Sequence, residues 1–142
     1  MIINAENLIL GRMASRVAQE LLRGEAVVII NAEKSIISGS KKNVIERYKK
    51  RLERKSIVNP ARHGPFFPRK PEGIVKRAVR GMLPIRRTKG REALKNLRVY
   101  IGIPKELEGK EMVTLENANV TKLRVPKYIR VGELSSFLGA EF

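Results

Sequence analysis

The chain has 142 residues, enough for one domain with a single core, and 42% of them are hydrophobic, which argues against a disordered chain. It carries 30 Lys and Arg against 14 acidic residues, a net charge of +16, and such an excess requires a polyanionic partner. The lack of cysteine excludes disulfides, thiolate zinc sites and a cysteine nucleophile, and is compatible with a reducing compartment.

The positive charge is concentrated in the middle of the chain. Residues 41–91 hold 18 basic residues and only Glu46, Glu53 and Glu72 as acids, whereas acids and bases nearly balance in residues 1–40 and 92–142. The N-terminus lacks a cationic start before an apolar run, and the longest such run, residues 26–30, is too short to span a membrane. We therefore expect a soluble, cytoplasmic protein of one domain, residues 1–142, with a basic region at 41–91.

The first thirty residues predict a strand, a helix and a second strand. Residues 1–4 form a short apolar strand, and from Gly11 onward apolar residues recur at helical spacing until Gly24, which suits a left-handed helix cap. The run AVVII at 26–30 is continuous and β-branched, as in a parallel strand covered on both faces. This order predicts a βαβ unit.

Two further helices and a long loop are expected in the basic region. A short apolar piece and a Gly-Ser turn within 34–43 lead into a helix through about Arg54, whose buried stripe is Val44, Ile45, Tyr48 and Leu52. Residues 55–71 contain four prolines and predict a loop. Pro71 and Glu72 open a third helix that should turn Ile74, Val75, Ala78, Val79 and Met82 toward the core.

The rest of the chain predicts fewer regular elements. Helical spacing stops at Pro84, and a cationic loop with Arg86, Arg87, Lys89 and Arg91 follows. The sequence LRVYIG at 97–102 predicts a strand, and residues 131–138 predict a terminal helix. The segment of about 103–142 is a mixed-charge C-terminal extension.

The sequence offers few residues that could support catalysis. General acid–base chemistry needs a histidine or a tuned carboxylate beside a partner, and the chain has one histidine and no aspartate. His63 lies in the proline-rich basic loop, where stacking or phosphate contact is the better interpretation. We therefore expect no catalytic residue, no cofactor, no metal and no small-molecule substrate.

A nucleotide site is the nearest alternative. The sequence ISGSKKN at 37–43 resembles a phosphate cradle before a helix, but the P-loop spacing of glycine, four residues and Gly-Lys-Ser/Thr is absent. A helix start with a basic first turn is the better interpretation of this segment. LGRM at 10–13 lacks the repeated glycines of a dinucleotide site.

Nucleic acid fits the basic region better than a membrane surface does. Solvent-exposed helix faces normally carry acidic residues among the basic ones. Where the acidic residues are missing, repulsion between the basic side chains lowers stability unless an anion is bound. With seven aromatic residues and no aromatic RNA-reading strand, contact with backbone and shape is favoured over reading of bases. Phe66 and Phe67 could either wedge against an unstacked base or anchor the loop. The candidate RNA-binding residues are Arg12, Arg16, Lys41, Lys42, Arg47, Lys50, Arg54, Lys55, Arg62, His63, Arg69, Lys70, Lys76, Arg77, Arg80, Arg86, Arg87, Lys89 and Arg91.

Three segments of the sequence resemble the large-subunit ribosomal protein L13 family. They are LGRMASRVAQELLRG (10–24), VVIINAEKSIISGSKKNVIERY (27–48) and AVRGMLPIRRTKGREALKNLRVYIG (78–102), in this order and spacing. The third is the most specific, because it joins Gly81-Met82-Leu83-Pro84, the glycine at 90 and the closing strand. The sequence NPARHGPFF and the short C-terminal extension are similar to the archaeal and eukaryotic branch.

The resemblance implies an α/β/α three-layer sandwich around a small, mainly parallel sheet, and a non-catalytic role. The partners it implies are large-subunit ribosomal RNA, during assembly and in the finished particle, and neighbouring large-subunit ribosomal proteins. Under this hypothesis the helix broken at Pro84 holds the following cationic segment rigidly for phosphate contact. Gly81 would permit either close packing or close approach of RNA. The alternatives are an RNA-modifying or nucleotide-binding α/β enzyme and a regulatory RNA-binding protein that acts off the ribosome.

Overall fold

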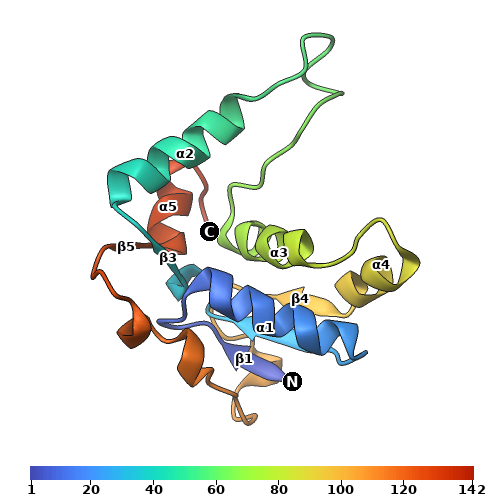
Figure 1. Ribbon diagram of the computed structural model, residues 1–142, viewed down its shortest axis with the longest axis vertical. Coiled ribbons are helices and arrows are strands. Elements are labelled where there is room, and N and C mark those ends of the chain that lie inside the picture. Colours follow the sequence, from blue (N-terminus) through green and yellow to red (C-terminus); the bar gives the residue numbers. More distant parts are fainter.

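A central parallel sheet joins two strands near the N-terminus to a third strand much later in the chain. The computed structural model describes residues 1–142 (Figure 1), and its main sheet contains β1 (Ile2–Asn4), β2 (Val27–Ile30) and β4 (Leu97–Val99) in the order β1-β2-β4. Ile3 pairs with Ile29, which in turn pairs with Val99. The middle strand β2 is buried at Val27, Ile29 and Ile30, as expected for a β-branched strand inside a sheet. The predicted parallel sheet is confirmed.

Helix α1 (Leu10–Leu22) connects β1 to β2 and completes the βαβ unit. Its apolar stripe of Met13, Val17 and Leu21 is buried, and the helix packs beside α3 (Pro71–Met82). Gly24 follows with a φ of +96°, which a residue with a side chain rarely adopts and which ends the helix as predicted.

A second, antiparallel pair of strands joins distant parts of the chain. The strands β3 (Ile36–Ser38) and β5 (Tyr128–Arg130) pair through Ile37 and Ile129. The terminal helix α5 (Val131–Phe137) follows β5 directly and buries Val131 and Leu134. This pair of strands connects the C-terminal extension to the N-terminal half of the chain. Four short 3-10 helices complete the fold: η1 (Ala32–Lys34) precedes β3, and η2 (Lys105–Leu107), η3 (Glu116–Ala118) and η4 (Val120–Lys122) lie in the C-terminal extension.

The basic region forms two helical arms and a projecting loop. Helix α3 lies against the body beside α1, helix α2 (Lys41–Glu53) diverges from it so that the two helices form the arms of a V, and residues 54–70 connect them through a long loop that extends away from the sheet (Figure 1). Helix α3 buries Ile74, Val75 and Val79, whereas α2 buries only Val44. The core beneath is one cluster of 25 buried residues, so α2 is the helix least attached to it.

The prediction that Met82 faces the core is wrong, because its side chain is 45% exposed. Helix α3 ends at this residue, and Leu83, which follows in an extended conformation, takes the buried position at 6% exposure. The remaining residues of the predicted α3 stripe do lie on the core side, with Ala78 half-buried.

The segment after Pro84 is more regular than predicted. Helix α4 (Thr88–Lys95) begins where a loop was expected, so Lys89 and Arg91 are helical while Arg86 and Arg87 remain in the connection. The fold is therefore α/β with a small, mostly parallel sheet, as predicted. The third layer of the expected sandwich stays a prediction.

Candidate nucleic-acid interface

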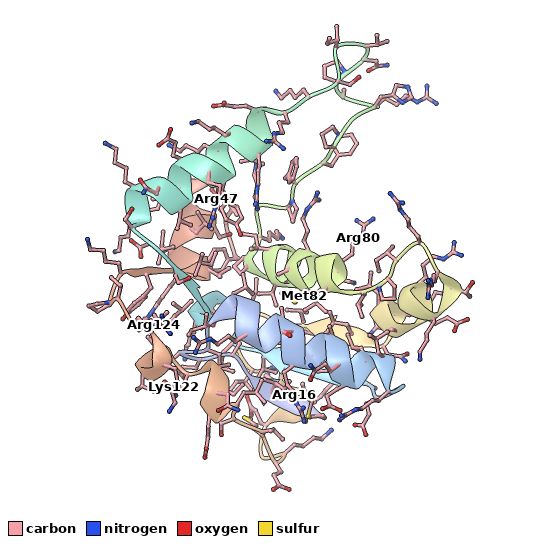
Figure 2. The ribbon with its side chains drawn as sticks, in the orientation of Figure 1. Arg16, Arg47, Arg80, Met82, Lys122 and Arg124 are labelled. Atoms are coloured by element: carbon pink, nitrogen blue, oxygen red, sulfur yellow. The ribbon has the colours of Figure 1, made fainter.

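The predicted cations of residues 41–91 lie on α2, the projecting loop, α3 and the start of α4. Figure 2 labels Arg47 on α2 and Arg80 on α3, the two arms of the V, whereas Arg16 lies on α1 and Lys122 and Arg124 lie in the C-terminal extension. Each arm thus carries its own group of cations. Two basic clefts result, one on each arm.

The first basic cleft lies along one face of α2. It is lined by Asn43, Glu46, Arg47, Lys50, Arg51 and Arg54, spaced three or four residues apart on the helix. Lys50 Nζ lies 2.8 Å from Glu46 Oε1, and this hydrogen bond lowers the pKa of the Glu46 carboxyl and raises the pKa of the Lys50 ammonium. None of the three arginines has a carboxylate partner, so their charge is available to an anion.

The second basic cleft lies where α3 ends and the chain turns toward α4. Its lining includes Arg77, Arg80, Gly81, Arg86 and Arg87 around the backbone of residues 83–85. The turn is held by hydrogen bonds that the amides of Ile85 and Arg87 donate to the carbonyls of Leu83 and Pro84, at 2.8 and 2.9 Å. The arginines are therefore presented from an ordered backbone, as the hypothesis of a rigid base requires.

Gly90 explains how α4 can follow this turn so closely. A Cβ atom at residue 90 would lie 2.2 Å from the carbonyl oxygen of Pro84, which is far inside van der Waals contact. Only glycine lets the first turn of α4 pack on Pro84 and hold Arg86, Arg87, Lys89 and Arg91 in one exposed group.

The two phenylalanines of the projecting loop have different roles in the structure. Arg77 donates a hydrogen bond to the carbonyl of Phe66 at 2.8 Å, and its guanidinium carbon lies 4.2 Å from the centre of the Phe67 ring. Phe67 and Arg77 therefore anchor the returning end of the loop on α3. The Phe66 side chain is 62% exposed.

The far part of the loop makes few contacts. Arg62 and His63 are exposed, and their amides donate hydrogen bonds to the carbonyl of Asn59 in a turn at the tip. Closer to α3, the hydroxyl of Ser135 donates to the carbonyl of Arg69, so α5 also fixes the loop's return. Lys55 and Lys70 at the two ends of the loop, and Lys76 on α3, are exposed and form no salt bridge.

Besides Lys50 and Arg77, three further candidates are engaged within the chain. Arg16 forms an ion pair with Glu20 at 2.8 Å, and Arg12 donates to the carbonyl of Asn117 in a separate cleft formed with residues 114–118. Lys41 lies 2.8 Å from Glu133. The structure does not bring Arg12 and Arg16 to either arm of the V.

Sequence reasoning missed two groups of cations. Arg51 lines the first basic cleft and stacks on Tyr48, 5.0 Å from the ring centre. Lys127 precedes β5, Arg130 is its last residue, and both share a cleft with Lys41. The spacing of Arg51, three residues after Tyr48 and four after Arg47, is a signal that could have found it.

Neither a metal-ligand cluster nor a membrane-spanning helix accompanies these clefts. No three His, Cys, Asp or Glu side chains lie close enough together to hold a metal ion. No helix has the length and apolar character needed to cross a membrane. What the arrangement offers chemically is exposed guanidinium and ammonium groups on two neighbouring helical arms.

A family model and individual relatives point to the same protein family. Residues 1–106 match the family model of Ribosomal protein L13. The large ribosomal subunit protein uL13 of Methanosphaera stadtmanae is 51% identical over 99% of this chain and 98% of its own length. The uL13 protein of Methanocaldococcus jannaschii is 48% identical, again over 99% of this chain and 98% of its own length. The uL13 protein of Saccharolobus solfataricus is 49% identical over 97% of this chain and 91% of its own length. Likeness of this extent, over the segments that form the sheet, α1, α3 and the turn at Pro84, shows that the chain belongs to the ribosomal protein L13 family.

Proposed function

We propose that this protein is a non-catalytic structural constituent of the large ribosomal subunit, which binds large-subunit ribosomal RNA and contributes to assembly of the particle. Family membership supports the assignment, since the relatives are named as large-subunit proteins. Neighbouring large-subunit proteins are the other partners, and the ribosome in the cytoplasm is its location. No cofactor or small-molecule substrate is needed for this role.

The observation that carries the proposal is the pair of basic clefts on the two arms of the V. Residues 41–91 hold 18 basic residues and three acids, and the unpaired arginines of both clefts face solvent. Self-repulsion of such a surface destabilises the free protein, and phosphate groups would relieve it. Arg47, Arg51 and Arg54 on one arm and Arg80, Arg86 and Arg87 on the other are the proposed principal phosphate contacts.

Sedimentation tests this function most directly. Tagged protein should travel with large subunits in a salt-washed sucrose gradient, and a lasting pool of unbound protein in growing cells would instead favour a regulatory RNA-binding protein that acts off the ribosome. For the enzyme alternative, ATP, GTP and S-adenosylmethionine should leave the melting temperature unchanged. A clear thermal shift with any of them would contradict the non-catalytic assignment.

A further inference from the structure

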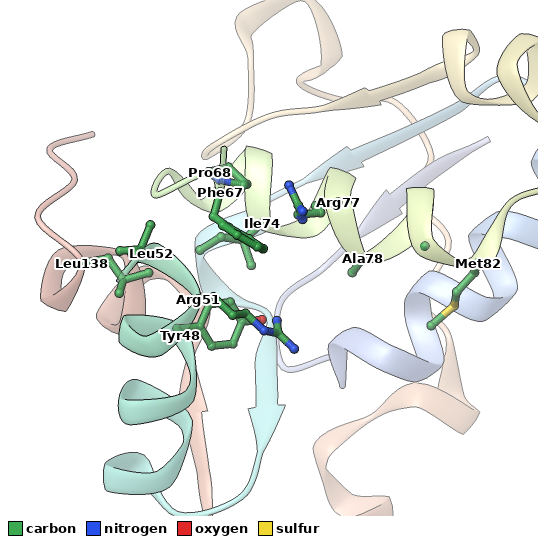
Figure 3. Close-up of a pocket in the computed structure, with 11 residues that line it drawn as sticks. Tyr48, Arg51, Leu52, Phe67, Pro68, Ile74, Arg77, Ala78, Met82 and Leu138 are labelled. Carbon is green, nitrogen blue, oxygen red and sulfur yellow. The ribbon is translucent and has the colours of Figure 1, made fainter. Parts of the chain in front are cut away.

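An apolar groove separates the two basic clefts. It has a volume of about 550 Å³ and runs between α2, the returning end of the loop and α3 (Figure 3). Tyr48, Leu52, Phe67, Ile74, Ala78 and Met82 provide most of its apolar lining. This volume is in the range of about 300 to 1,000 Å³ that is typical of small-molecule pockets in proteins.

The groove is not filled by the chain itself. Met82 is 45% exposed, and the α2 residues Tyr48 and Leu52 are only partly covered although they lie on the apolar stripe of their helix. Apolar side chains left open in this way mark a binding surface when they are grouped in a hollow. The occupant must therefore bring an apolar face.

Two arginine–aromatic stacks stand on opposite walls of the groove. Arg51 lies over Tyr48 on the α2 wall, and Arg77 lies over Phe67 on the wall formed by the loop and α3 (Figure 3). Guanidinium planes and aromatic rings are the surfaces on which unstacked RNA bases pack. A flat aromatic ligand suits this geometry better than a branched aliphatic side chain does.

The same two arginines connect the groove with the basic clefts. Arg51 lines both the groove and the first cleft, and Arg77 lines both the groove and the second cleft. A ligand held in the groove therefore has unpaired cations on both sides of it. An apolar segment of a neighbouring protein would leave those cations without partners, whereas a nucleotide carries a phosphate on each side of its base.

We propose that the groove receives the base of an unpaired nucleotide, while the flanking phosphates of the same RNA strand lie in the first and second basic clefts. This inference rests on the proposed RNA-binding function and specifies a subsite within it. It assigns base-stacking roles to Tyr48, Phe67, Arg51 and Arg77, in addition to the phosphate contacts.

Gly81 gives the groove its open mouth. It lies three residues after Ala78 and four after Arg77, on the helix face that lines the groove, and it borders the second cleft as well. A Cβ atom at this position would meet no atom within 4 Å, so nothing in the chain requires glycine inside this helix. Close packing within the chain therefore does not require Gly81, and the proposed groove accounts for it by close approach of RNA.

The absence of contacts at Gly81 allows a clean test. Gly81→Leu should leave the fold intact, because leucine favours helix and has room, but its side chain would narrow the groove. Gly11→Leu is the matched control: Gly11 is also an exposed helical glycine with no atom within 4 Å of its Cβ position, and it lies on α1 outside the groove. Both variants keep every charge.

Binding is measured with transcribed large-subunit ribosomal RNA and with a fully paired RNA duplex, over a series of salt concentrations. Gly81→Leu should bind the ribosomal RNA about ten-fold more weakly, in the range that loss of one stacked base gives, with an unchanged salt slope. Its affinity for the duplex, which offers no unpaired base, should match that of the unaltered protein. Gly11→Leu should match the unaltered protein with both RNAs.

Ultraviolet cross-linking gives a second readout on the unaltered protein. A nucleotide adduct on the peptides that carry Tyr48 or Phe67 is expected, and Gly81→Leu should reduce it. Equal affinity of both leucine variants for ribosomal RNA would overturn the proposal. If Gly81→Leu bound RNA normally yet failed to enter large subunits, the groove would belong to a protein neighbour instead, and the proposal would again be wrong.

These outcomes separate the subsite from the function on which it rests. If the unaltered protein itself failed to bind ribosomal RNA in a salt-dependent manner, the proposed function would fail. If it bound RNA and only the leucine substitution at Gly81 had no effect, the function would stand and the base-binding groove would be rejected.

Discussion

The group of cations after Pro84 permits a quantitative test of phosphate contact. Arg86, Arg87, Lys89 and Arg91 are exposed, and none of them forms an ion pair or a side-chain hydrogen bond within the chain. Replacing all four with alanine should therefore preserve the fold. The backbone of the turn at Pro84 is held by main-chain hydrogen bonds that these substitutions leave in place.

The expected loss of RNA affinity follows from counterion release. Each phosphate contact contributes about 0.7 to 0.9 to the slope of log affinity against log salt, so the quadruple variant should have a slope that is flatter by about three. At about 0.1 M salt this corresponds to roughly thousand-fold weaker binding, and the two curves should converge as the salt concentration approaches about 1 M.

Filter binding or fluorescence anisotropy with transcribed large-subunit ribosomal RNA measures the slope, and thermal denaturation checks the fold. A matched control removes the same amount of charge from the C-terminal extension by replacing the exposed Lys105, Lys110, Lys122 and Arg124 with alanine, and its slope should change much less. A quadruple variant at 86–91 with an unchanged slope, or with a loss no larger than the control's, would refute the assignment of this group to phosphate contact.

Three further predictions follow from burial and backbone contacts. Gly90→Ala should lower the free energy of unfolding by about 1 to 3 kcal/mol, because its Cβ would collide with the carbonyl of Pro84; a melting temperature equal to that of the unaltered protein would contradict this packing. Met82→Ala should lower the free energy of unfolding by less than about 1 kcal/mol in chemical denaturation, since the side chain is 45% exposed. Val79→Ala, at 0% exposure on the same helix, should lower it by about 1.5 to 3 kcal/mol, and the reverse order would contradict the burial of Val79 and the exposure of Met82. In residues 55–70, where only two amides donate backbone hydrogen bonds, hydrogen exchange should be fast in the free protein and slow once ribosomal RNA is bound; protection in the free protein comparable to that of residues 26–31 would show that the loop is ordered without RNA.

Local patterns were sufficient for the elements that pack on their sequence neighbours. The continuous β-branched run at 27–30 can only be satisfied inside a sheet, and the spacing of Met13, Val17 and Leu21 allows only one buried face for α1. Pro71 at the first position of α3 fixes where that helix begins. These signals act over a few residues, and the structure follows them closely.

Features that depend on distant segments could not be predicted in the same way. The strand at 36–38 pairs with a partner more than ninety residues later, and no local pattern identifies that partner. Met82 fits the apolar stripe by spacing, but Leu83 takes the buried position because the chain leaves the helix at this point. Helix α4 has a short apolar face of Ala93 and Leu94, and the need for glycine at residue 90 becomes visible only when Pro84 lies against it.

The candidate site shows the same division. Charge density alone located residues 41–91 as the basic region, because clustering of like charges is a property of the sequence itself. The groove and the role of Arg51 depend on how α2 faces α3 across the loop, and spacing along either helix does not determine that geometry. Arg12 and Arg16 lie on α1, apart from both arms, where they contact Asn117 and Glu20 within the chain, and their contact with RNA stays a prediction.

The weak attachment of α2 gives these observations a common physical basis. Only Val44 of this helix is fully buried, while Arg47, Arg51 and Arg54 face a surface with few acids, so the helix combines little core contact with strong self-repulsion. An RNA strand that fills the groove and neutralises both clefts would bind the closed arrangement of α2 and α3 and not an unfolded arm, and it would stabilise that arrangement by mass action. We therefore expect α2 to be less protected from hydrogen exchange than α1 and α3 in the free protein and to gain protection when RNA supplies both phosphates and an unpaired base.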